Sequence, residues 1–382
     1  MTAGAGMIEI RPGYKQTEVG VIPEDWQIKR IGDFTVCTAG GTPSTFVKSF
    51  WGGNIRWMNS GELNLKIVSE VDGRITEDGL RNSSTKEIPP YCVLVGLAGQ
   101  GKTRGTVAIN TVGLCTNQSI AAIFPNDTFE AKYLFYNLEN RYLELRNLST
   151  GEGGRGGLNL TIIRNIPVPL PPLAEQRAIA AALSDVDGLL TALAELIAKK
   201  RAIKQAAMQQ LLTGQTRLPG FSGEWKKLAF DDVFSCINSK SFQIQTNEYH
   251  EWGVYPIVDQ GKNLIAGYSD RIDKLLKCPP GGLIVFGDHT CIVKYVDFDF
   301  VVGADGTQIL TATPGQILQF HAYQLVLSGV LPTGYNRHFK YLRDRTFFAP
   351  IENEQRAITS ILADMDAEIS ALEAQRAKVQ AL

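Results

Sequence analysis

Apolar residues recur at helical spacing in two long segments of the chain. Between Glu175 and Leu212, and again between Glu352 and Leu382, an apolar side chain follows every four or three positions. A 3.5-residue period places one apolar seam along each helix, which is typical of a coiled coil. We expect the two helices to pair in antiparallel orientation; the alternative is that each packs on its own globule. The predicted seam consists of Ile179, Leu183, Val186, Leu190, Leu193, Ile197, Ile358, Leu362, Met365, Ile369 and Leu372.

The sequence also repeats itself. Residues 174–179 read AEQRAI and residues 353–358 read NEQRAI, an offset of 179 positions. Fainter matches align Trp26 with Trp225 at an offset of 199, and Ile120 with Ile309 at an offset of 189. The falling offset indicates that the second half has lost residues in its middle, as expected for a common scaffold with different loops.

The segments outside the two long helices are rich in short β-type runs. Such runs lie at 91–95, 106–109, 119–124, 282–286 and 291–296, edged by Gly, Pro, Asn and Asp, while 131–148 and 320–327 read as helices. We therefore predict an α+β fold: two strand-rich α/β domains separated by two long antiparallel coiled-coil helices, with an internal pseudo-two-fold repeat. The predicted parts are a tail at 1–13, a first domain at 14–170, a spacer helix at 171–213, a second domain at 214–349 and a final helix at 350–382.

The charge and the cysteine content of the chain argue against several classes of protein. The 382 residues carry 38 basic and 39 acidic side chains, so the net charge of −1 excludes a polybasic protein, and any contact with nucleic acid must use local patches. Six scattered cysteines form no C-x-x-C pair and match no common zinc spacing, which favours a reduced cytoplasmic protein without a metal site. The longest charge-free run, 306–336, is broken by polar residues, so we expect no membrane span.

A glycine-rich loop in the first half fits the phosphate-loop pattern. Residues 96–103 read GLAGQGKT, but the chain continues with RGTVAI, which favours a second strand over the helix that a nucleotide site needs. We interpret the segment as a turn between two strands, and a P-loop nucleotide-binding enzyme remains the alternative. Such a loop can also approach DNA, with Gln100, Lys102 and Arg104 meeting phosphates or base edges.

A second pair of loops occupies matching positions in the two halves. Residues 150–157 read TGEGGRGG, and their counterpart at 329–336 precedes another basic segment. Coincident placement favours a shared ligand surface. The further candidate DNA contacts are Arg155, Asn159, His289, Lys294, Asn336, Arg337, His338 and Lys340. No catalytic constellation and no metal-ligand cluster emerges from the residues.

The layout resembles the specificity (S) subunit of Type I restriction-modification systems. The opening GYKQTEVGVIPEDW at 13–26, the spacer PVPLPPLAEQRAI at 167–179 and LLTG at 211–214 carry the resemblance, which covers essentially the whole chain. The E-Q-R-A-I sequence at the start of both long helices is the most specific part of the resemblance. One departure is that the second helix has no counterpart of residues 204–212; because the family's chain ends lie near one another, we expect residues 1–26 to complete that end.

The resemblance implies a non-catalytic recognition subunit. Each domain would read one half of a bipartite target in double-stranded DNA, while the helices space the domains and dock two modification subunits. Those partners would carry S-adenosylmethionine and methylate adenine, and restriction subunits would use ATP and Mg; this chain itself would hold no cofactor. A coiled-coil adaptor that binds only proteins remains a further alternative. The predicted docking residues are Glu175, Gln176, Arg177, Glu354, Gln355 and Arg356.

Overall fold

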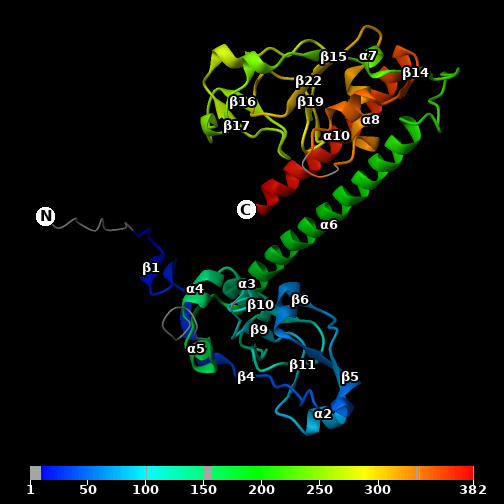
Figure 1. Ribbon diagram of the computed structural model, residues 1–382. Coiled ribbons are helices and arrows are strands. Elements are labelled where there is room, and N and C mark those ends of the chain that lie inside the picture. Colours follow the sequence, from blue (N-terminus) through cyan, green and yellow to red (C-terminus); the bar gives the residue numbers. More distant parts are fainter. Residues whose placement is uncertain (1–9, 100, 149–156, 333, 335, 382) are drawn as a thin grey trace. The chain divides into compact units, whose positions relative to one another are not determined.

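The computed structural model divides the chain into two compact units. It describes residues 10–99, 101–148, 157–332, 334 and 336–381. Unit 1 is Met1–Gly188 and unit 2 is Leu189–Leu382, coloured from blue to green and from green to red in Figure 1. Among the described residues, no helix is both long and apolar enough to span a membrane.

Unit 1 is built around two sheets. The first has the order β4-β12-β9-β10-β6, in which only the β10–β6 pair is parallel. Its strands β9, β10 and β12 are fully buried, as their runs of apolar residues predict. The strands are β4 (Cys37–Ala39), β6 (Ile67–Val68), β9 (Val93–Gly96), β10 (Val107–Asn110) and β12 (Ile120–Ile123).

The two faces of this sheet have different neighbours. Val93, Val95 and Ile109 pack with α3 (Ala131–Glu139) and α5 (Leu160–Arg164), whereas Leu94 and Ala108 point to the second sheet. That second sheet has the order β7-β5-β11-β8. Its strands are β5 (Trp51–Met58), β7 (Arg74–Ile75), β8 (Glu87–Ile88) and β11 (Leu114–Thr116).

The remaining elements of unit 1 are short. β1 (Tyr14–Thr17) and β2 (Gly20–Pro23) form a hairpin, and β3 (Gln27–Arg30) pairs with β13 (Pro167–Leu170). The helices are α1 (Ile31–Phe34), α2 (Glu77–Arg81) and α4 (Tyr142–Asn147), with 3-10 turns at Lys48–Phe50 and Ser60–Leu65.

Unit 2 repeats this topology. Its two sheets have the orders β15-β22-β19-β20 and β17-β16-β21-β18, and the β16–β21 pair is parallel as the β5–β11 pair is. The internal repeat predicted from the sequence is therefore confirmed at the level of strand order. The strands are β14 (Lys226–Leu228), β15 (Phe234–Ile237), β16 (Tyr255–Val258), β17 (Gly267–Ser269), β18 (Leu275–Leu276), β19 (Leu283–Gly287), β20 (Val293–Val296), β21 (Phe300–Val302), β22 (Thr307–Ala312) and β23 (Phe347–Ala349).

The helices of unit 2 also match those of unit 1. α7 (Phe230–Val233), α8 (Leu318–Ser328) and α9 (Phe339–Arg343) stand where α1, α3 and α5 stand in the first half, and 3-10 turns lie at Lys240–Phe242, Thr246–Glu248 and Ile272–Lys274. The described part of unit 2 has no counterpart of β6 or α4, which is one part of its shorter middle.

The prediction of one continuous helix over 131–148 is wrong. The structure divides that segment into α3 and α4, with Asn140 and Arg141 between them. Arg141 has φ −101° and ψ 22°, outside the helical region, and its guanidinium donates to the Pro167 carbonyl at 2.7 Å. This bond to β13 accompanies the break, and the sequence pattern alone does not report such a contact.

The two long helices are α6 (Leu173–Leu211) and α10 (Glu352–Gln380). Within unit 2 the later part of α6 pairs with α10 in antiparallel orientation, because Arg201 contacts Glu373 at 2.6 Å whereas Lys204 contacts Asp366 at 2.5 Å. The seam residues Ile197, Ile358, Leu362 and Ile369 are buried there, and Leu193, Met365, Leu372 and Leu190 are buried or half-buried.

The earlier part of α6 behaves differently. Ile179 and Ala180 pack into the core of unit 1 beside α3, and Val186 is half-buried. The two expectations for the long helices therefore each hold for one part of α6: pairing with α10 in unit 2, and packing on its own globule in unit 1.

Candidate nucleic-acid interface

The glycine-rich connection between β9 and β10 is held by neighbouring elements of unit 1. Arg146 of α4 donates to the Gly101 carbonyl at 2.6 Å, and the Tyr142 hydroxyl donates to the Lys102 carbonyl at 3.0 Å. The backbone N–H of Leu158, just before α5, donates to the Leu97 carbonyl at 2.8 Å. The loop is thus fixed between α4 and the start of α5.

This loop does not have the geometry of a nucleotide site. β9 and β10 are antiparallel neighbours, and the described residues between them form bends and turns, with no helix starting at Lys102. Gly105 has φ +80°, and a Cβ there would lie 3.2–3.3 Å from Arg146 and Tyr142, so the turn needs glycine. The side chain of Lys102 is exposed, while Arg104 is buried; Gln100 lies outside the described residues.

The corresponding connection in unit 2, between β19 and β20, is held in the same way. Asp288 follows β19, and its carbonyl accepts the backbone N–H of His338 at 2.8 Å. The Asp288 carboxylate also accepts the N–H of Phe339 at 2.7 Å, at the first residue of α9. In both units, therefore, the residue after the third strand of the first sheet accepts a hydrogen bond from one of the two residues that precede the helix after the glycine-containing loop.

His289 lies beside this junction and belongs to a small polar cluster. Its backbone N–H donates to Oε1 of Gln260 at 3.3 Å, and its Nδ1 lies 3.3 Å from the Asn336 carbonyl. Gln260 in turn donates to the Asp305 carbonyl at 2.9 Å. A Cβ on Gly306, which has φ +84°, would lie 2.8 Å from the His289 ring. The structure thus brings His289 and Asn336 together and adds Gln260, which sequence reasoning missed although it is the second residue after β16, in a D-Q-G segment.

The other candidates of unit 2 fall into two groups. Lys294 is buried, and its ammonium donates to the Asp259 carbonyl at 2.8 Å; burial lowers the pKa of this lysine. His338 is also fully buried, with Nδ1 3.0 Å from the Asp288 carbonyl. These two side chains support the fold around the junction, because neither reaches the surface.

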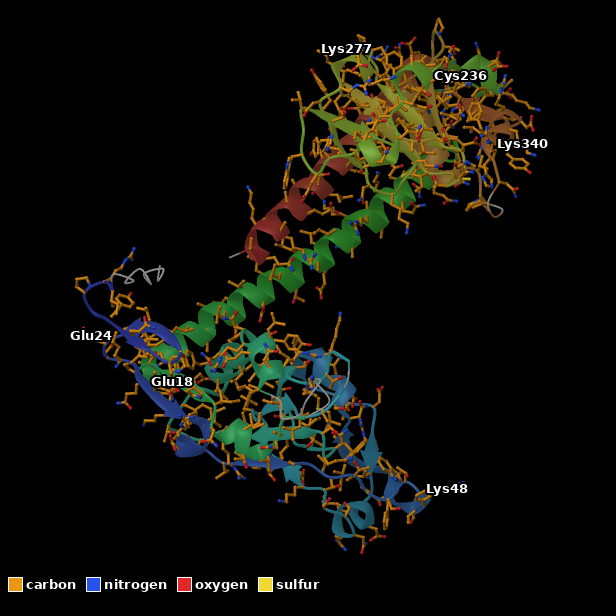
Figure 2. The ribbon with its side chains drawn as sticks, turned by 60° about the vertical axis from the view of Figure 1, so that its left-hand side comes forward. Glu18, Glu24, Lys48, Cys236, Lys277 and Lys340 are labelled. Carbon is orange, nitrogen blue, oxygen red and sulfur yellow. The ribbon has the colours of Figure 1, made fainter. Side chains whose placement is uncertain are left out.

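Arg337 and Lys340, together with Asn336, form the exposed group. Figure 2 shows Lys340 on the surface of unit 2, and its ammonium lies 4.8 Å from the centre of the Tyr341 ring. A guanidinium, an ammonium and an amide at the start of one short helix are the side chains that contact phosphates and base edges. Exposure makes these three the best candidate DNA contacts of unit 2.

In unit 1 one of the two candidates after the glycine-rich loop caps a helix, and the other lies outside the described residues. Asn159 caps α5, since its Oδ1 accepts the Ile162 N–H at 2.9 Å. Arg155 lies outside the described residues. Lys102 is therefore the exposed cation of unit 1 among the predicted contacts that the structure describes.

Three of the six predicted docking residues are buried, and the other three are exposed. Gln176 and Gln355 are buried, and Glu354 is buried in an ion pair with Arg217, with both N–O contacts at 2.6 Å. Glu175, Arg177 and Arg356 are exposed. A partner protein would meet the exposed three, while the buried three are held within their own units.

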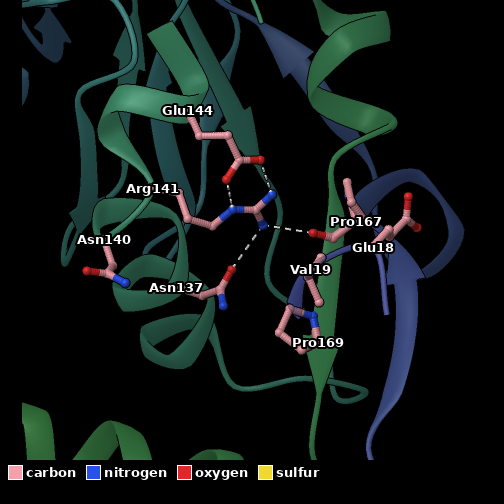
Figure 3. Close-up of a pocket in the computed structure, with 8 residues that line it drawn as sticks. All are labelled: Glu18, Val19, Asn137, Asn140, Arg141, Glu144, Pro167 and Pro169. Carbon is pink, nitrogen blue, oxygen red and sulfur yellow. Dashed lines mark hydrogen bonds and ion pairs between the residues drawn. The ribbon is translucent and has the colours of Figure 1, made fainter. Parts of the chain in front are cut away.

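A pocket on unit 1 lies between α3, α4 and β13 (Figure 3). Arg141 points into it, but its guanidinium is held by Glu144 at 2.6 Å and by the Pro167 carbonyl at 2.7 Å. The same guanidinium lowers the pKa of Glu144. These internal bonds give the pocket a structural role in joining α4 to β13. Elsewhere in the described residues, no group of three His, Cys, Asp or Glu side chains is placed to hold a metal ion.

Comparison with known proteins finds a family similarity over the first half of the chain. The model of the Type I restriction modification DNA specificity domain matches residues 23–205. The Type I restriction enzyme MjaIX specificity subunit of Methanocaldococcus jannaschii is 32% identical over 182 residues, which are 46% of this chain and 41% of that protein. The EcoR124I/EcoR124II specificity subunit of Escherichia coli is 24% identical over 196 residues, 50% of this chain and 46% of that protein.

The matched region is thus about half the length of these curated relatives or less. A solved structure extends the likeness of fold to both units. The Type I restriction-modification S subunit from M. genitalium superimposes with a TM-score of 0.62 over 93% of each chain, at 15% identity.

Proposed function

We propose that the chain selects a DNA sequence for a Type I restriction-modification complex, because residues 23–205 match the model of the Type I restriction modification DNA specificity domain. Each unit would read one half of a bipartite target. The observation that supports this is the repeated junction: the turn after β9 meets the start of α5, and the turn after β19 meets the start of α9. Two copies of one scaffold with different loops can read two different half-sites.

The exposed side chains at each junction suit this task. Lys102 in unit 1 and Arg337 and Lys340 in unit 2 would contact phosphates or guanine, and the amide of Asn336 can pair with adenine. The buried His338 and Lys294 would keep the unit 2 junction in shape. Sequence choice would then depend on which loop side chains reach base edges.

The near-zero net charge constrains how the complex binds DNA. With 38 basic and 39 acidic residues, the chain alone would gain little affinity from phosphates and bind DNA weakly. Two modification subunits, which carry S-adenosylmethionine and methylate adenine, would supply most of the affinity for DNA. Restriction subunits would add the steps that need ATP and Mg. The chain itself would recognise DNA without catalysing a reaction or holding a cofactor, and would work in the cytoplasm where the DNA is.

The test is to map methylated adenines in cells that express the modification subunits with variants of this chain. We expect Lys102→Ala to relax recognition of one half-site, and Arg337→Ala with Lys340→Ala to relax only the other. Lys277→Ala is the matched control, because this exposed lysine pairs with Asp299, away from the β19–β20 turn. Relaxation of both half-sites by one variant would contradict the two-reader proposal, and methylation without sequence preference would favour a protein-only adaptor.

A further inference from the structure

A cavity of unit 2, between the end of α8 and β23, lies where unit 1 has the pocket of Figure 3. Ser328 in its wall corresponds to Arg141 at an offset of 187, the offset that aligns the hydrogen-bonded tyrosines of α3 and α8. Thr346 in its wall corresponds to Pro167 at the offset of 179. We call it the α8–β23 cavity, and its lining includes Leu212, Leu327, Ser328, Arg345, Thr346 and Phe348.

Both cavities contain a guanidinium, but different residues carry it. In unit 1 it belongs to Arg141, which follows α3. In unit 2 the corresponding position is Ser328, and the guanidinium comes from Arg345, which precedes β23. Arg345 stands at the position of Ile166, a residue of the core of unit 1. It donates to Oγ of Ser328 at 2.8 Å, so the guanidinium lies at the same end of the cavity as its counterpart.

The two guanidinium groups differ in their partners. That of Arg141 donates twice to the Glu144 carboxylate, at 2.8 and 2.6 Å (Figure 3). Glu144 belongs to α4, which has no counterpart in the described part of unit 2. Arg345 forms no ion pair with a carboxylate of the described residues; besides its bond to Ser328, its guanidinium lies 6.0 Å from the centre of the Phe347 ring. The arginine in unit 2 therefore lacks the carboxylate that the repeat provides in unit 1.

The environment of Arg345 favours an anion with an apolar part. The guanidinium is half-buried, and burial lowers the pKa of Arg345 because it disfavours the charged form. A guanidinium has five N–H donors and binds a carboxylate through two parallel hydrogen bonds. Much of the remaining wall is apolar and comes from Leu212, Leu327 and Phe348. The cavity volume of about 220 Å³ is several times the about 30 Å³ that one water occupies, so a small organic anion fits.

We propose that the α8–β23 cavity binds a small organic acid, whose carboxylate takes the place at Arg345 that Glu144 takes at Arg141 in unit 1. The apolar group of the ligand packs against Leu327 and Phe348. A bound carboxylate offsets the cost of keeping a half-buried charge without an ionic partner. The site is formed by residues of unit 2 alone and uses none of the side chains proposed to read DNA, so it does not rest on that proposal.

The test titrates the full chain with benzoate by isothermal titration calorimetry, in a chloride buffer without other carboxylates or phosphate. We expect saturable binding at one site, which Arg345→Gln weakens at least about tenfold because the charged, two-pronged donor is lost. Benzamide has the same shape without the charge and should also bind at least about tenfold more weakly. Arg343→Gln is the matched control and should leave the affinity unchanged, since this exposed arginine pairs with Asp231 and does not line the cavity.

A second variant keeps Arg345 and supplies the carboxylate from the chain itself. Leu327→Glu introduces a carboxylate into the wall of the cavity, as Glu144 does in unit 1. We expect this variant to lose benzoate binding as well, because the new side chain occupies both the guanidinium and the space beside it. Circular dichroism of each variant shows that the chain remains folded.

Four results would overturn the proposal. The absence of saturable benzoate binding would remove the site, and equal affinity for benzamide would show an apolar cavity that does not recognise a carboxylate. Full affinity in both Arg345→Gln and Leu327→Glu would place the benzoate elsewhere on the chain. Inorganic phosphate that bound more tightly than benzoate, and lost its affinity in Arg345→Gln, would make a phosphate group the occupant. None of these results depends on the methylation pattern, so they are distinct from a failure of the DNA-reading proposal.

Discussion

The hydroxyl of Tyr323 donates to the carboxylate of Asp366 at 2.7 Å and so joins α8 to α10. The first repeat contains the same bond, from Tyr136 of α3 to Asp187 of α6, also at 2.7 Å. Burial, followed by the nearby aspartate, raises the pKa of both phenols, to about 12 for Tyr136, so both remain donors at neutral pH. Each long helix is therefore tied to its own domain by an equivalent hydrogen bond.

Removing either hydroxyl should destabilise its unit. We expect Tyr323→Phe and Tyr136→Phe each to lower the free energy of unfolding by about 1.5–3 kcal/mol, the usual contribution of a hydrogen bond to a charged group. Urea denaturation followed by circular dichroism measures the change. Tyr91→Phe, at an exposed position, is the control and should change stability by less than about 0.5 kcal/mol. Equal effects of all three substitutions would show that neither bond is specific.

The glutamines of the duplicated E-Q-R sequence make a second set of hydrogen bonds that both repeats share. Oε1 of Gln355 accepts the Ile317 N–H and its Nε2 donates to the Pro350 carbonyl, both at 2.9 Å. Gln176 makes the same two bonds, with Glu130 at 2.9 Å and Pro171 at 2.8 Å. The repeated sequence thus encodes a clamp between the start of each long helix and the start of α3 or α8.

Breaking this clamp should cost more than losing a surface contact. Gln355→Leu keeps the side-chain volume but leaves the Ile317 N–H and the Pro350 carbonyl without their partner, so we expect a loss of about 2–3 kcal/mol. Gln176→Leu should cost a similar amount in unit 1. The exposed Gln375→Leu on α10 is the control in the same denaturation experiment. A change below about 0.5 kcal/mol in the buried variants would contradict the clamp.

The repeat and the long helices could be predicted from the sequence because both are properties of regular spacing. The offset of 179 located α6 and α10, and the 4-3 spacing of residues such as Ile358 and Leu362 indicated a coiled-coil seam. The strands β9, β10, β12 and β19 were found from apolar runs that are buried on both faces, and β20, whose residues alternate between half-buried and buried, was found from its β-branched residues. Such patterns record burial directly along the chain.

The roles of individual polar residues could not be predicted in this way. Gln176 and Lys294 look like surface residues by type, but each is buried by partners distant in sequence. The break between α3 and α4 likewise accompanies a bond from Arg141 to Pro167 in another element. These features depend on tertiary contacts, which the hydrophobic pattern does not encode. Gln260 was missed for the same reason: its role depends on its contacts with His289 and Asp305.

The two leucines at matching positions offer a direct test of the difference between the repeats. Leu362 is fully buried and should lose about 2–5 kcal/mol on substitution by Ala, because a cavity is left among Met208, Leu211 and Ile358. Leu183, which is 39% exposed, should lose less than about 1 kcal/mol in the same substitution. Chemical denaturation of both variants gives the comparison. Equal losses would mean that Leu183 is covered in solution as Leu362 is.

The fully buried His321 should make unit 2 sensitive to acid. Burial lowers the pKa of this histidine from 6.5 to about 4, and its ring lies among Phe234, Phe320 and Phe347. Between pH 6.5 and pH 4 the imidazole of His321 is therefore protonated in the unfolded chain but not in the folded chain. The free energy of unfolding should fall as the pH decreases through this window, by about 3 kcal/mol from this residue, and should level off below pH 4.

The measurement is the urea midpoint of the wild type and of His321→Gln at several pH values between 7.5 and 4. The variant lacks the titrating ring, so its stability should depend less on pH than that of the wild type across the window from 6.5 to 4. His250→Gln, at an exposed position, should retain the pH dependence of the wild type. If the two glutamine variants kept the same slope, the acid sensitivity would have to come from groups other than His321.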